Sequence, residues 1–78
     1  MKPVTTEKAI MMIERDNILT FIVDKRLNKV DIKKKIEELF DVKVRHVRIQ
    51  IKDNKKRAYI QLKKDFPAID IATKLGFM

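Results

Sequence analysis

The sequence lacks cysteine, serine and tryptophan, and its 78 residues include one glycine, one histidine and two prolines. Without cysteine the chain can form no disulfide and no thiolate metal site, and without serine or cysteine it lacks two of the usual nucleophiles. A single glycine near the C-terminus cannot form a glycine-rich phosphate loop, and one histidine gives no metal-ligand cluster. These absences predict that the protein is not an enzyme and uses no metal, cofactor or small-molecule substrate.

The length predicts one small domain that spans residues 1–78. A chain of this size buries roughly 60–65% of its unfolded surface, so its core is thin and leaves no room for a deep pocket. The first ten residues, MKPVTTEKAI, contain no apolar stretch long enough for a signal peptide, and no segment is long enough to cross a bilayer. We therefore expect a cytoplasmic protein with no membrane insertion.

The net charge of +8 is concentrated in one part of the chain. Residues 43–64 contain nine Lys or Arg residues and one carboxylate, Asp53, whereas residues 1–42 contain nine Lys or Arg and eight Asp or Glu. A merely solvated surface usually mixes both signs, but a clustered positive surface is typical of nucleic-acid-binding proteins. The distribution of charge therefore predicts a polyanionic partner.

The pattern of apolar residues predicts six elements, namely a helix at 6–15, a strand at 17–24, a helix at 28–41, strands at 42–52 and 57–63, and a helix at 66–77. The two last strands form a hairpin around the turn DNKK. This order predicts an α+β fold, an antiparallel sheet with helices packed on both faces, related to the ferredoxin-like and split βαβ arrangements.

Local signals support the ends of these elements. Thr5 or Thr6 is expected to cap the first helix, Asn28 and Asp31 resemble a capping box, and a change of parity near Arg45 predicts a β-bulge. The predicted apolar stripes comprise Ala9, Ile10, Met11 and Ile13, which should leave the first helix mostly buried, then Ile32, Ile36, Leu39 and Phe40, and finally Ala68, Ile71, Ala72 and Leu75. Phe77 is expected to close the last helix after Gly76.

The hairpin carries the candidate binding residues. Alternation places Arg48, Gln50 and Lys52 on one face of the first strand, and Arg57, Tyr59 and Gln61 on one face of the second. An outward tyrosine between arginines can stack on a base, and Lys55, Lys56 and Arg57 beside the turn can reach phosphates. Two alternatives remain open: a helix covers Tyr59 and makes it a core residue, or the lysines only protect an edge strand. His46 is expected to have no special role.

Four segments in this order and spacing resemble the L-twenty-three family of large-subunit ribosomal proteins: TTEKA at 5–9, NILTFIVD at 17–24, NKVDIKKKIEELFDVKV at 28–44 and KKRAYIQL at 55–62. The resemblance extends over about residues 3–77. The C-terminal AIDIATKLGF and the compact turn resemble the archaeal branch. Bacterial members usually carry a long loop in the hairpin that enters the exit tunnel, and this chain lacks that loop.

The resemblance implies a structural protein that binds large-subunit rRNA beside the polypeptide exit. It implies neighbouring ribosomal proteins and signal recognition particle as partners, with Glu7 as the acidic residue that docks such factors. By the same resemblance, Lys25, Arg26, Asn28, Lys29, Lys56, Arg57 and Tyr59 are rRNA contacts. The family usually has V-N-T where this chain has Val47, Arg48 and Ile49, so a charge contact from Arg48 would replace that of the asparagine.

We therefore expect a cytoplasmic, ribosome-bound protein that binds rRNA by charge and shape. Two other hypotheses about the function remain open. The chain could be a free-standing nucleic-acid-binding module, which co-sedimentation with large subunits would distinguish. It could also be a protein-interaction module with lysine-protected edges, which would bind no RNA even at low salt.

Overall fold

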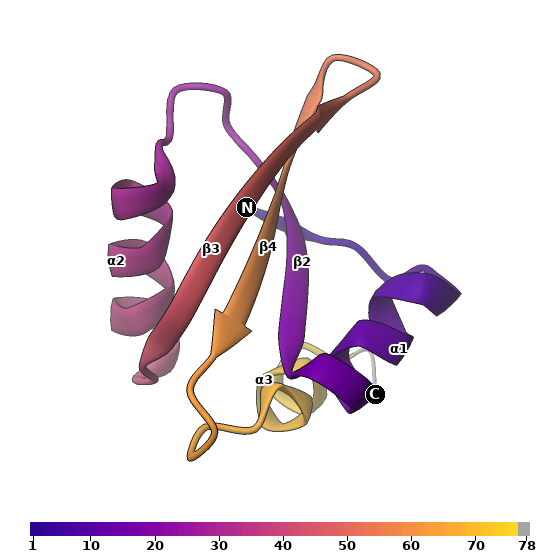
Figure 1. Ribbon diagram of the computed structural model, residues 1–78, viewed down its shortest axis with the longest axis vertical. Helices are drawn as coiled ribbons and strands as arrows, with labels where there is room; N and C mark the ends of the chain where they lie inside the picture. The colour runs from indigo at the N-terminus through magenta and orange to yellow at the C-terminus, as the bar shows by residue number, and fades with distance from the viewer. Residues whose placement is uncertain (77–78) are drawn as a thin grey trace.

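The computed structural model describes residues 1–76, which form three helices and a four-stranded antiparallel sheet (Figure 1). The elements are β1 (Lys2–Pro3), α1 (Glu7–Asp16), β2 (Ile18–Val23), α2 (Lys29–Phe40), β3 (Val44–Lys52), β4 (Lys55–Leu62) and α3 (Ala68–Lys74). The predicted α+β class and all six expected elements are confirmed. The sequence pattern missed β1, which is only two residues long and includes a proline.

The strand order is β1-β2-β4-β3, and every neighbouring pair is antiparallel. Because β2 and β3 both run antiparallel to β4, they are parallel to each other, and α2 connects them across the intervening strand. This is the split βαβ arrangement that the sequence predicted. β1 adds an edge beside β2, where Pro3 can lack a backbone N–H without disrupting a central strand.

Short-range chemistry sets the ends of the elements. Thr6 accepts a hydrogen bond from the backbone N–H of Ala9, and Asn28 and Asp31 form the complete capping box of α2. The hairpin turn consists of Asp53 and Asn54, both with positive φ, which is the two-residue geometry that matches the twist of the flanking strands. The pairing register shifts between Val44 and His46, which confirms the predicted bulge.

The sheet has one face in the core and one face that is largely uncovered. Leu19, Phe21, Ala58 and Ile60 point to the core face, where α2 and α3 contribute Ile32, Ile36, Ala68, Ile71 and Ala72. The other face, which we call the open face, carries Thr20 of β2, His46, Arg48, Gln50 and Lys52 of β3, and Lys55, Arg57, Tyr59 and Gln61 of β4.

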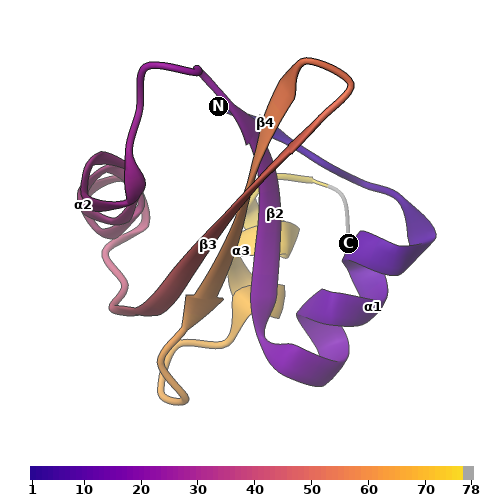
Figure 2. The same cartoon turned by 45° about the horizontal axis from the view of Figure 1, so that its top comes forward.

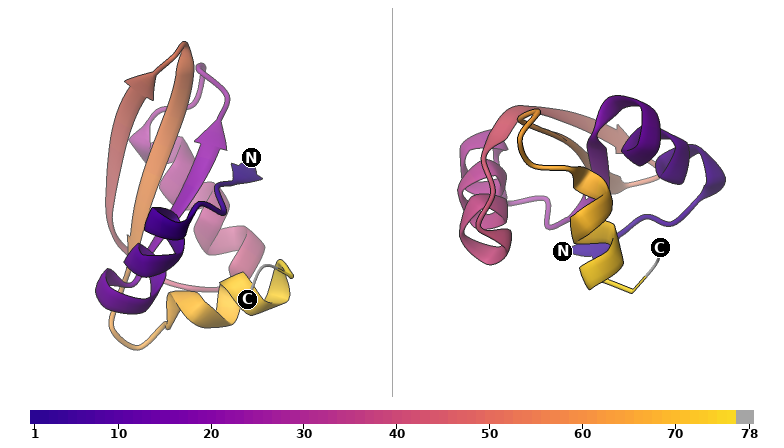
Figure 3. Two further views of the ribbon diagram at one scale, coloured as in Figure 1. Left: turned by 90° about the vertical axis from the view of Figure 1, so that its right-hand side faces the viewer. Right: turned by 90° about the horizontal axis from the view of Figure 1, so that it is seen from below.

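The helices lie on both sides of the sheet, as predicted. Turned views show α2 and α3 on one side, whereas α1 runs beside β2 and leaves β3 and β4 bare on its own side (Figures 2 and 3). Side chains of α1 and of the open face together line a groove, which is described below. Because α1 lies along β2, the open face is hollowed next to this helix.

Three predicted core positions are wrong. In α1 only Ala9 and Ile13 are buried, and Met11 is 45% exposed, so this helix is not mostly buried. The buried residues of α2 are Ile32 and Ile36, with Phe40 partly buried against the same core, and Leu39 is 60% exposed. Leu75 is 38% exposed, beyond the last turn of α3. The expected contact of Phe77 lies outside the described residues.

Asn17 joins two connections that are far apart in the sequence. It follows α1 in the left-handed conformation, and its side-chain amide donates to the carbonyl oxygens of Leu62, Lys63 and Phe66 at 3.1–3.4 Å. Its Oδ1 accepts from the backbone N–H of Ala68, the first residue of α3. Pro67, which precedes α3, provides no side-chain cap, so Asn17 supplies it from another part of the chain.

Candidate nucleic-acid interface

The open face gathers five of the predicted binding residues: Arg48, Lys52, Lys55, Arg57 and Tyr59. Strand pairing sets them in rows, with Arg48 opposite Tyr59, Gln50 opposite Arg57 and Lys52 opposite Lys55. Successive residues on one face of a strand lie about 7 Å apart, close to the spacing of phosphates along an RNA strand. The arrangement presents cations and hydrogen-bonding groups in a regular pattern, as binding to a nucleic-acid backbone requires.

Tyr59 is half-buried on the open face, so no helix makes it a core residue. Its hydroxyl donates a hydrogen bond of 2.9 Å to Oε1 of Gln50 on the adjacent strand. Gln61 donates to the backbone carbonyl of Asp16 at 3.1 Å, which ties β4 to the end of α1. The bond to Gln50 holds the tyrosine in place on the sheet surface, where its ring can stack against a planar partner.

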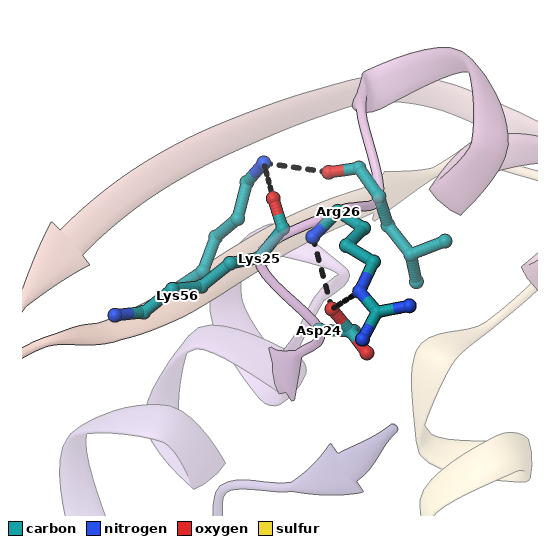
Figure 4. Close-up of polar contacts among 5 residues, drawn as sticks. Asp24, Lys25, Arg26 and Lys56 are labelled. Carbon is teal, nitrogen blue, oxygen red and sulfur yellow. Dashed lines mark hydrogen bonds and ion pairs between the residues drawn. The ribbon is translucent and has the colours of Figure 1, made fainter.

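Lys56 belongs to a different surface from Arg57, although the two are neighbours in the sequence. It lies opposite Ile51, on the core side of the hairpin. Its Nζ donates to the carbonyl oxygen of Leu27 at 2.6 Å and to that of Lys25 at 3.4 Å (Figure 4). The Lys56 side chain therefore fixes the loop between β2 and α2.

That loop contains the second group of predicted residues, Lys25, Arg26, Asn28 and Lys29. Asp24 accepts from the backbone N–H of Arg26 at 2.9 Å and lies 3.9 Å from its Nε, in an exposed ion pair of small energetic value (Figure 4). Asn28 already uses Oδ1 to cap α2. Lys25, Arg26 and Lys29 are exposed, and their loop lies at the same end of the sheet as the hairpin turn (Figure 1).

Glu7 is exposed in the first turn of α1. Met11 and Glu14 follow at one and two helical turns, and both are also exposed, so they share the outer face of the helix. None of these three residues lines the surface that Arg48, Lys52 and Arg57 share with α1. The structure thus keeps the predicted docking residue apart from the candidate RNA-binding residues.

A groove with a volume of about 800 Å³ runs between α1 and the open face. Its lining includes four cationic side chains, those of Lys8, Arg48, Lys52 and Arg57, and one carboxylate, Asp16. Thr20 lies in this groove, is 5% exposed, and its hydroxyl has no hydrogen-bond partner among the described residues. Sequence reasoning missed Lys8 and Thr20, because the groove exists only once α1 packs beside β2.

Within residues 1–76, no three His, Asp or Glu side chains come close enough to hold a metal ion. No helix among these residues has the length and hydropathy needed to cross a bilayer.

A small α+β domain with a basic, tyrosine-bearing sheet face belongs to the class of proteins suited to binding RNA. A family model described as Ribosomal protein L23 matches residues 1–69. The chain belongs to the ribosomal protein L23 family, which confirms the resemblance and the expectation that it is not an enzyme.

A curated relative, the large ribosomal subunit protein uL23 of Trypanosoma brucei brucei, is 48% identical over 77 residues. The match covers 97% of this chain and 47% of the relative, so the chain spans about half the length of that protein. The relative is eukaryotic, and the assignment to the archaeal branch stays a prediction.

Proposed function

We propose that the chain is a structural constituent of the large ribosomal subunit and binds large-subunit rRNA through the open face. The observation that carries this proposal is the segregation of charge on the sheet: Arg48, Lys52, Lys55 and Arg57 lie on one face beside Tyr59, with no carboxylate in the rows they form. Such a face releases counterions when it meets RNA phosphates, and the tyrosine adds a stacking surface. Membership of the family supports the choice of rRNA over other polyanions.

The loop between β2 and α2 is the proposed second contact with rRNA. Lys25, Arg26 and Lys29 are exposed there, and Lys56 holds the loop against the hairpin. The loop and the hairpin turn lie at the same end of the sheet (Figure 1), so one folded RNA can touch the loop and the open face next to the turn. Asn28 belongs to this contact through its side-chain amide nitrogen, since its Oδ1 and its backbone N–H are both used in the capping box of α2.

Binding of the purified chain to large-subunit rRNA across a salt series tests the proposal. We expect binding that persists against an excess of unrelated RNA, weakens steeply as salt rises, and is accompanied by co-sedimentation with large subunits. Salt-independent binding, or equal affinity for any RNA, contradicts it. Specific binding without co-sedimentation would instead favour a free-standing nucleic-acid-binding module.

We further propose that the domain lies near the polypeptide exit, contacts neighbouring ribosomal proteins, and helps to dock nascent-chain factors such as signal recognition particle through Glu7. The support is the exposure of Glu7 on an outer helix face that also carries Met11 and Glu14, none of which lines the surface shared with Arg48, Lys52 and Arg57. A helix face with an apolar residue between two acidic ones can contact a basic, partly apolar partner.

Ribosomes reconstituted with Glu7→Ala are expected to bind signal recognition particle several-fold more weakly than wild-type ribosomes. Lys2→Ala, which changes an exposed residue outside α1, serves as the control variant. Equal binding by Glu7→Ala and wild type, with rRNA binding intact in both, contradicts the docking role and leaves the rRNA proposal untouched.

A further inference from the structure

We propose that the free edge of β3 binds an extended acidic segment of a protein partner, which pairs antiparallel to β3 and adds a strand to the sheet. In this segment apolar residues alternate with acidic ones, and the carboxylates lie on the side of the open face. The segment and rRNA then use the same cations and exclude each other. Only this exclusion rests on the proposed rRNA binding.

The two edges of the sheet differ in their capacity to pair with another strand. β1 has two residues, one of which is Pro3 and has no N–H to donate. β3 has nine residues, and among residues 1–76 its only neighbouring strand is β4. A long edge strand presents a row of backbone N–H and C=O groups without partners, so the edge of β3 can accept a further strand.

The free backbone groups of β3 lie toward the hairpin turn. In an antiparallel pair, alternate residues turn their N–H and C=O groups away from the partner strand. Counted from the two-residue turn, these residues are Ile51, Ile49 and Val47. At the other end of β3, the N–H of Val44 already donates to Oε2 of Glu37 at 2.9 Å, so α2 occupies that end. The half of β3 next to the turn is therefore the half that a partner can reach.

The core side of this half-strand is apolar and incompletely covered. Ile51 is 69% exposed and Ile49 is half-buried, although both lie on the same side as the buried Val47. Apolar side chains of an added strand would remove both isoleucines from water, whereas the phosphate backbone of an RNA gains nothing from them. This side of the edge therefore favours a protein partner.

The open-face side of the half-strand determines the charge of the partner. Arg48 and Lys52 project there beside Gln50, and residues 43–52 contain no carboxylate. A second copy of this chain, paired through the same edge, would bring these cations close together, and like charges on adjacent strands are destabilising. Carboxylates on an added strand would instead complement them. The edge thus selects an acidic strand and disfavours self-association.

Peptides test the pairing directly. The probe is a short peptide, blocked at both ends, in which valine alternates with glutamate. NMR measures hydrogen exchange of single amides of the full chain at low salt. We expect saturating peptide to slow the exchange of the Ile49 and Ile51 amides at least tenfold, because strand pairing engages these N–H groups. Exchange that stays equally fast with bound peptide overturns the edge site.

Two modified peptides form a matched pair. Residues directly opposite each other lie on the same side of a sheet, so the valines oppose Ile49 and Ile51 and their N–H groups face β3. Methylation of the valine nitrogens should weaken binding at least tenfold, whereas methylation of the glutamate nitrogens, which face away from β3, should leave it unchanged. Equal binding by both peptides means that charge alone attracts them, and this result overturns the proposal.

Protein variants test the same edge from the other side. Ile51→Pro removes an N–H that β4 does not use and should weaken peptide binding about tenfold. Ile51→Thr keeps a β-branched residue with less apolar surface, and should weaken it about threefold even if the proline variant fails to fold. Ile69→Thr, which makes the same change at a 44% exposed position on α3, is the control and should bind as wild type. Equal binding by Ile51→Thr and Ile69→Thr contradicts the proposal.

Competition separates this inference from the function already proposed. Saturating peptide should weaken the binding of labelled large-subunit rRNA at least tenfold, because its carboxylates occupy Arg48 and Lys52. An unchanged rRNA affinity with the peptide bound overturns the exclusion. If rRNA does not bind even without peptide, the proposed rRNA function fails, and the exchange of the Ile49 and Ile51 amides still decides whether the edge site exists.

Discussion

Asn17→Ala is expected to lower the free energy of unfolding by about 3 kcal/mol, a large share of the stability of a domain of this size. Asn17 adopts φ 58°, a conformation that costs other non-glycine residues about 1–2 kcal/mol. The substitution also removes the donor that serves three carbonyl groups and the acceptor for the N–H of Ala68. Part-buried groups left without a partner add a further 1–3 kcal/mol.

Urea denaturation of Asn17→Ala, Asn17→Gly and Asn54→Ala separates the cost of the backbone conformation from the cost of the lost hydrogen bonds. Asn17→Gly keeps the backbone conformation but loses the hydrogen bonds, so it should lose less stability than Asn17→Ala. Asn54→Ala is the matched control, because Asn54 has φ 62° in the exposed hairpin turn, and it should cost about 1 kcal/mol. If Asn17→Ala costs no more than Asn54→Ala, the side chain of Asn17 does not hold the two connections together.

Arg48→Gln combined with Arg57→Gln is expected to weaken rRNA binding about thirtyfold at moderate salt. Each arginine should contact one phosphate, and each contact contributes about 0.7–0.9 to the slope of log affinity against log salt. The double variant should therefore flatten that slope by about 1.5 units. The two side chains occupy adjacent rows of the open face, so one RNA segment can contact both.

A matched control variant removes two positive charges from a different surface of the protein. Lys33→Gln combined with Lys34→Gln changes two exposed residues of α2, on the opposite side of the sheet. It should shift the salt slope by much less than the arginine pair. An equal loss in both double variants would mean that net charge, and not the open face, governs binding. Lys56 stays unchanged in both, because its loss would also free the loop at Leu27.

Some features followed from the sequence because they depend on residues close together in the chain. Asn28 and Asp31 form the predicted capping box three residues apart, and alternation in β4 placed Ala58 and Ile60 inward with Arg57 and Tyr59 outward. The change in the alternation of apolar residues near Arg45 predicted the β-bulge that the structure shows between Val44 and His46. Such features reflect hydrogen bonds and periodicities within one or two turns, which the sequence shows directly.

The placement of the candidate binding residues on one face of the hairpin could be predicted for the same reason. The clustering of basic residues in 43–64 and the outward tyrosine are properties of a single hairpin, and strand alternation orders them. Alternation alone did not place Lys56, whose ammonium turns to carbonyls of Leu27 and Lys25 some 30 residues earlier. Membership of the family also followed from the sequence, since the order and spacing of its motifs extend over most of the chain.

Other features were decided by the tertiary structure. Leu39 and Met11 fit apolar stripes, yet the faces that α2 and α1 turn to the sheet leave both exposed. The bonds of Asn17 reach residues 45–51 positions away. The groove beside Thr20 and Tyr59 exists because α1 packs along β2 and is tied to β4 at its end, by the bond from Gln61 to Asp16 (Figure 3). The sequence thus determined the elements and the charge of the hairpin, whereas long-range packing decided which side chains meet, because such contacts depend on where distant segments dock.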